Sequence, residues 1–181
     1  MTDRFSVGAL LKAQRDSMRR GDVSGDRPDR LAQLVLFGLP LVLAVVAWVR
    51  NFELADAGSV LAAFGLLAAT LVALFVQLAA WRLRLNDRAR NGYVEVERPA
   101  REAIDEATYH TLVGALVSGA GAVVTVIGSN SAGENKPVAG WLASLVVALG
   151  ASLALHFIII VNLVFDAYQT ARDGADDHSR V

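Results

Sequence analysis

The sequence has no cysteine, only four prolines and few charged residues. The lack of cysteine excludes disulfides, thiolate zinc sites and iron–sulfur clusters. Charged residues make up 19% of the chain and hydrophobic residues 54%, and the mean hydropathy is +0.43. Because a soluble domain has about 25% charged and about 45–50% apolar residues, these departures indicate a membrane protein. The net charge of −1 argues against nucleic acid as a partner.

Long apolar runs predict four transmembrane helices. A run of about 18 or more apolar residues is long enough to cross a bilayer as a helix. Such runs occur at 31–49, 57–81, 111–127 and 138–165. None has the polar outer stripe of a helix in a soluble bundle. We therefore expect an all-α, polytopic membrane protein whose four transmembrane helices form two in–out–in hairpins.

Polar segments divide the chain around these spans. Residues 5–20 have the apolar and basic faces of an amphipathic helix. Pro99 suits the start of a new helix that runs into the third span, and residues 93–97 alternate like a short strand. The expected organisation is an N-terminal helix and linker at 1–30, a first hairpin at 31–81, a helical connection at 82–110, a second hairpin at 111–165 and a tail at 166–181.

Basic residues are distributed very unevenly among the polar segments. Of the 17, only Arg50 and Lys136 lie in the two short loops, and the other 15 lie in the tails and the central connection. By the positive-inside rule, both termini and the central connection are cytoplasmic. The preference for Arg over Lys is typical of a GC-rich bacterial genome. These features predict a multi-pass protein of the bacterial inner membrane.

Rows of small residues at four-residue spacing predict where the spans pack. Helices in lipid associate through close packing and hydrogen bonds, which small residues permit. The contact is expected either within one bundle or between the copies of a homo-oligomer. The candidates on the third and fourth spans are Gly114, Ser118, Gly140, Ser144, Ala148 and Ser152. A similar row on the second span is formed by Ala62, Gly65, Ala69 and Ala73.

Polar side chains at membrane depth are costly and therefore point to function. His156 lies well inside the fourth span. It is expected to be either a neutral histidine bonded to a backbone carbonyl or a pore-lining, proton-sensing group. Pro40 is expected to kink the first span, either as fixed geometry or as a gating hinge.

Further polar residues lie near the cytoplasmic ends of the second and fourth spans. Asn162 and Asp166 are four residues apart, on one helix face. Together with Gln77, Arg82 and Arg84 they could form an anchoring cluster of ion pairs and amides. Around an oligomer axis they could instead form a constriction, since rings of charge set pore selectivity.

The sequence offers no catalytic machinery. It has no phosphate-binding glycine loop, no HExxH motif and no nucleophile elbow. Glu102, Glu106 and His110 share a helix face at four-residue spacing, but one helix with three weak ligands is a poor metal site. We therefore expect no enzyme activity, no catalytic residue, no metal and no cofactor.

One segment resembles a known group of proteins. The end of the fourth span, with Leu155, His156, Phe157, Asn162, Leu163 and Tyr168, resembles small four-span proteins of bacterial anti-phage operons. That resemblance implies a membrane-disrupting effector beside a cytosolic sensor. The expected function is a small homo-oligomeric channel or pore-type effector in contact with membrane lipid, controlled through its cytoplasmic segments. A cytosolic protein partner would contact residues 1–20 and 82–110. The alternative is a non-catalytic accessory or scaffold subunit of a larger membrane complex.

Overall fold

The computed structural model describes residues 30–90, 98–133 and 136–178, and the predicted helix at 5–20 and the strand-like segment at 93–97 lie outside them. The described residues form four helices and no strand, which confirms the all-α prediction. Their bounds are α2 Arg30–Val49, α3 Ala57–Arg90, α4 Arg98–Ala132 and α5 Gly140–His178.

Three of the helices are long and apolar enough to cross a membrane, over Ala57–Asp87, Arg98–Ala132 and Gly140–Arg172. The apolar part described in α2, Leu34–Val49, is shorter. As the sequence predicted, α3 continues past the second span and α4 begins near Pro99. The fourth span differs at both ends. Val138 precedes α5 instead of opening it, and the helix runs through most of the segment expected to be a tail.

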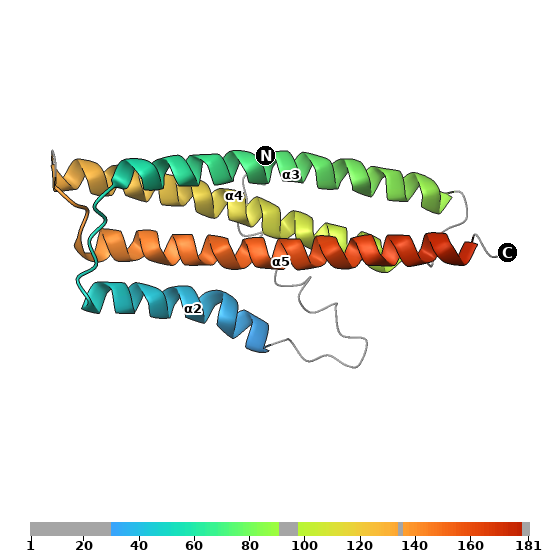
Figure 1. The fold of residues 1–181 in the computed structure, drawn as a ribbon, viewed down its shortest axis with the longest axis horizontal. Helices are drawn as coiled ribbons and strands as arrows, with labels where there is room; N and C mark the ends of the chain where they lie inside the picture. The colour runs from blue at the N-terminus through green and yellow to red at the C-terminus, as the bar shows by residue number, and fades with distance from the viewer. Residues whose placement is uncertain (1–29, 91–97, 134–135, 179–181) are drawn as a thin grey trace, which may run out of the picture.

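The helices are arranged side by side in the order α2, α5, α4, α3 (Figure 1). Successive helices run in opposite directions, as in two hairpins. Within the described residues, however, α2 packs against α5 and makes no contact with α3, its partner in the first hairpin. In Figure 1, α2 lies alongside only the half of α5 that is nearer the short loops. The other half of α5 is therefore uncovered by α2.

The two short loops are joined to each other. Leu54 and Val138 form an isolated antiparallel bridge, in which each backbone N–H donates to the other residue's carbonyl at 2.8 and 3.1 Å. Val138 is 2% exposed and lies against Gly128 of α4. We call this side of the molecule the loop end, and the opposite side, where α3 ends and α4 begins, the connection end.

A seven-residue repeat organises the core of α3, α4 and α5. Each of these three helices carries a row of buried residues spaced seven apart. This spacing is typical of helices that cross at a small angle with interlocking side chains. The members on α3 are all Phe or Leu, and the members on α4 are all Ala or Gly. They are Phe64, Leu71, Leu78 and Leu85 on α3, Ala100, Ala107, Gly114, Gly121 and Gly128 on α4, and Val146, Leu153, Ile160 and Ala167 on α5.

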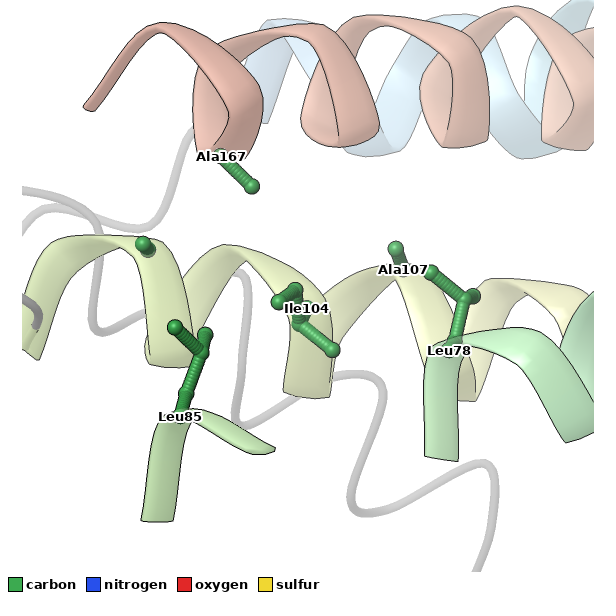
Figure 2. Close-up of a cluster of buried hydrophobic side chains, with 6 residues drawn as sticks. Leu78, Leu85, Ile104, Ala107 and Ala167 are labelled. Atoms are coloured by element: carbon green, nitrogen blue, oxygen red, sulfur yellow. The ribbon is translucent and has the colours of Figure 1, made fainter. Parts of the chain in front are cut away.

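The large residues of α3 lie against the small residues of α4. A Cβ atom on Gly114 would lie 3.2 Å from Leu71 Cδ1, and one on Gly121 would lie 2.5 Å from the Phe64 ring. At the connection end, Figure 2 shows Leu78 directed toward Ala107, in the same cluster as Ala167 of α5. Because the small residues let α4 approach both neighbours closely, α4 is the most buried of the three spans.

Candidate functional site

The polar residues of the long helices fall into three places in the structure: a buried histidine pair, an ion pair near the connection end, and exposed groups on α3 and α5. These three places together contain the predicted polar site residues of the spans. Pro40 lies apart from them, buried within α2, and that helix continues through it.

His156 is 3% exposed and faces α4, where its ring meets that of His110 with the ring centroids 5.4 Å apart. The Nδ1–H of His156 donates to the carbonyl of Ser152 at 2.8 Å. His110 is 1% exposed, and its Nε2 lies 4.0 Å from Glu106 Oε1. The pair therefore joins α4 to α5 within the protein core.

Glu102, Glu106 and His110 do not assemble into a metal site. No group of three His, Asp or Glu side chains within the described ranges is arranged to hold a metal ion. Glu102, which shares the spacing of Glu106 and His110, is exposed and pairs with Arg98 at 3.0 Å. Along this helix face, Glu102 thus lies at the surface in an ion pair, whereas His110 is buried.

Arg82 does not join the predicted cluster with Asn162 and Asp166. It pairs with Asp105 of α4 through two bonds, with Nε 2.6 Å from Oδ1 and Nη2 3.0 Å from Oδ2, and it also bonds Asn86. Such a two-bond arginine–carboxylate contact fixes the relative position of the two helices, and the two opposite charges neutralise each other. It therefore anchors α3 to α4 near the connection end.

The remaining polar candidates are exposed on two separate surfaces. Gln77 and Arg84 line a hollow between α3 and α5, whereas Asn162 and Asp166 lie on a part of α5 outside that hollow. The structure thus divides the cluster expected from the sequence into two pairs. Each pair occupies a surface that the described residues of one copy leave open.

The rows of small residues also separate into buried and exposed sets. Gly114, Ser118 and Ser144 are buried, and the Ser118 hydroxyl donates to the carbonyl of Phe64 at 2.6 Å. Gly140 opens α5 and is exposed. The half-buried members are Ala148 and Ser152. All four members of the α3 row are exposed: Ala62, Gly65, Ala69 and Ala73.

The four-residue spacing missed the side chains that face α4. These are the large members of the seven-residue repeat on α3, and the signal that finds them is the regular recurrence of Phe and Leu among alanines from Phe64 to Leu85. It also missed the contact between His110 and His156, because these residues belong to different spans and no local pattern connects them.

No protein-family model, curated protein or solved structure matches the chain.

Proposed function

We propose that this protein is a small homo-oligomeric membrane channel or pore-type effector. The observation that carries the proposal is the exposure of Asn162 and Asp166 on α5, a helix otherwise apolar enough to span a membrane. Polar side chains on such helices are costly against lipid and usually face a bundle interior or a water-filled cavity. A second copy packed on this part of α5 would provide that environment.

The lumen of such a channel would lie between copies. Within one copy, the space among α3, α4 and α5 is filled by buried apolar residues and by the histidine pair. A ring of Asn162 and Asp166 around an oligomer axis would instead form a polar constriction near the connection end. The exposed row of small residues on α3 offers a surface on which helices of neighbouring copies could approach closely.

The proposed location is the bacterial inner membrane, with both termini and the 82–110 connection in the cytoplasm. The 15-to-2 distribution of basic residues supports this orientation. Control would then come from the cytoplasmic side, through residues 1–20 and 82–110 and a cytosolic partner protein. This arrangement matches the resemblance to four-span anti-phage effectors and involves no enzymatic step.

The test is ion and dye flux from liposomes that contain the purified full-length protein. Asn162→Leu and Asp166→Asn should change the rate or the ion selectivity of flux, while the protein stays folded and oligomeric. Asn130→Leu is the matched control, because Asn130 is an exposed asparagine at the loop end of α4, away from the α5 surface. If neither the wild type nor any variant passes ions or dye after addition of cytosolic extract, the channel proposal fails.

The second candidate is an accessory or scaffold subunit of a larger membrane complex. The exposed row Ala62, Gly65, Ala69 and Ala73 favours it, since the same close approach could receive a helix of another protein. Crosslinking from a cysteine at Gly65, in a chain that has none, separates the two. A product of twice the protein's mass supports the oligomer. A crosslink to one other protein, the same in every preparation, supports the subunit.

A further inference from the structure

A groove runs along the surface between α3 and α5. It consists of two hollows of about 550 and 600 Å³ that share Leu74, Trp81 and Val164 and are therefore continuous. We call it the α3–α5 groove. It extends from Thr70 to Arg84 on α3 and from Phe157 to Tyr168 on α5.

The lining of the groove is mainly apolar. Phe157, Val161 and Phe165 of α5 are each between 45 and 56% exposed. The Thr70 hydroxyl does not alter this, because it donates to the carbonyl of Leu66 in its own helix at 2.8 Å. The further polar side chains in the lining belong to α3 and are Gln77 and, closest to the connection end, Arg84.

Arg84 is the cation at the end of the groove closest to the connection end. It is exposed, and within the described part of the chain no carboxylate pairs with it. Arg82, two residues earlier, differs because Asp105 neutralises its charge. A positive charge therefore remains at this end of the groove, next to the amphipathic ring of Trp81, which is the residue type found at the boundary between hydrocarbon and head groups.

We propose that the α3–α5 groove binds one anionic phospholipid. An acyl chain would lie on the apolar part, and the phosphate would meet the Arg84 guanidinium and the Gln77 amide. The length fits: the 14 residue-to-residue steps from Thr70 to Arg84 rise about 21 Å, and one leaflet with its head groups is about 20–22 Å thick. The groove goes beyond the proposed channel, because it involves neither Asn162 nor Asp166.

Selectivity in this site must come from the head group. An acyl chain in the groove leaves one apolar environment for another, so its burial discriminates little between lipids. The contact of one basic side chain with an anionic surface corresponds to about a fivefold preference. We therefore expect about fivefold tighter binding of phosphatidylglycerol than of phosphatidylcholine.

The experiment reads the groove through the fluorescence of Trp81. The full chain carries Trp48→Phe and Trp141→Phe, two exposed positions outside the groove, which leave Trp81 as the sole tryptophan. It is placed in vesicles of phosphatidylcholine that contain small fractions of chain-brominated phosphatidylglycerol or chain-brominated phosphatidylcholine. Bromine quenches Trp81 at close range, so quenching against lipid fraction gives the relative affinity of the two lipids.

Two matched pairs of variants locate the bound lipid. Arg84→Gln should reduce the preference to about one, whereas Arg98→Gln, which removes an exposed cation from the same end of α4, should leave it unchanged. Val161→Phe should weaken quenching by filling the apolar part. Ile158→Phe adds the same bulk to an exposed position of α5 outside the groove and should have no effect.

Several results would overturn the proposal. Equal quenching by both lipids would show that Arg84 selects no head group. If Arg98→Gln lost the preference for phosphatidylglycerol as much as Arg84→Gln does, the preference would come from general surface charge. Absence of quenching by either lipid would show that something else covers the groove, such as a second copy or residues 1–29. Because binding is read without flux, failure here leaves the channel proposal standing, and failure of conduction leaves this one standing.

Discussion

The Phe64 ring occupies the space in which Gly121 would carry a side chain. Three atoms of the ring lie 2.5–2.8 Å from the position of a Cβ on Gly121, and Phe64 is only 5% exposed. Ser118, one turn away on α4, donates its hydroxyl to the carbonyl of Phe64. The ring therefore cannot move away without opening the contact between α3 and α4.

Gly121→Ala should thus destabilise the protein by about 1–3 kcal/mol, the usual cost of overpacking a close contact. Gly119→Ala is the control on the same helix, since a Cβ there meets no atom within 4 Å. Unfolding of both variants by SDS in mixed micelles measures the difference. Adding Phe64→Leu should restore part of the loss in Gly121→Ala, and equal stability of the two alanine variants would contradict the packing.

Leu78→Ala should cost about 2–5 kcal/mol, because it removes a fully buried leucine and leaves a cavity. Leu78 is 2% exposed and lies against Ala107 in the core at the connection end (Figure 2). Leu83→Ala truncates the same residue type on the same helix at a position that is 65% exposed, and it should change stability by less than about 1 kcal/mol. Thermal unfolding in one detergent compares the two variants. If Leu83→Ala were the less stable variant, the buried face of α3 would not be the one that carries Leu78.

His156→Leu should lower stability by about 1–3 kcal/mol, because it removes the bond to Ser152 and leaves His110 without its ring contact. Asn162→Leu should leave stability nearly unchanged, since Asn162 is exposed in one copy. The same two variants should behave differently in flux assays, once flux is divided by the amount of folded protein. The normalised flux of His156→Leu should then match that of the wild type. A lower normalised flux would indicate that His156 takes part in conduction.

The start of α3 should be sensitive to acid. Asp56 precedes the helix, and the hydroxyl and backbone N–H of Ser59 donate to its carboxylate, which lowers the pKa of Asp56 from its ordinary value of 3.8. A carboxyl with a lowered pKa stabilises the fold above its ordinary pKa and loses that effect as pH falls through the lowered value. Stability should therefore decline below about pH 4.

Two substitutions isolate this effect. Asp56→Asn keeps a good capping residue without the titrating group, so its stability should decline less between pH 5 and pH 3 than that of the wild type. Asp56→Ala should be less stable than the wild type at pH 7, because it removes the cap itself. An unchanged pH dependence in Asp56→Asn would assign the acid sensitivity to other carboxylates.

Much of the fold could be predicted because membrane spans follow from local composition. The continuation of α3 past the second span followed from the predicted helical connection at 82–110, and the start of α4 followed from Pro99. The displaced start of α5 did not follow. Val138 is as apolar as the residues after it, and its position in the loop depends on its bridge to Leu54, 84 residues earlier.

The polar candidates show a similar division. Burial of His156 and its bond to a backbone carbonyl could be expected from the sequence alone, and the structure contains both. The partner of Arg82 could not be foreseen, because Asp105 and Asp166 both lie near the connection end and the sequence does not show which of their helices is the neighbour of α3. The choice depends on which helix is the neighbour, and the packing of α4 between α3 and α5 decides it.

The bridge between Leu54 and Val138 has a mechanical consequence. It ties the connections of both hairpins together at one end of the molecule, where Val138 is also held against α4. The helices are thus clamped at the loop end, and any swing of one helix against another has the loop end as its fulcrum. Displacement grows with distance from a fixed point, so movement increases along α3 and α5 toward the connection end and is larger at Arg84 and Asp166 than at the loop end. A contact made at the connection end would therefore shift the helices more than the same contact made near the loops.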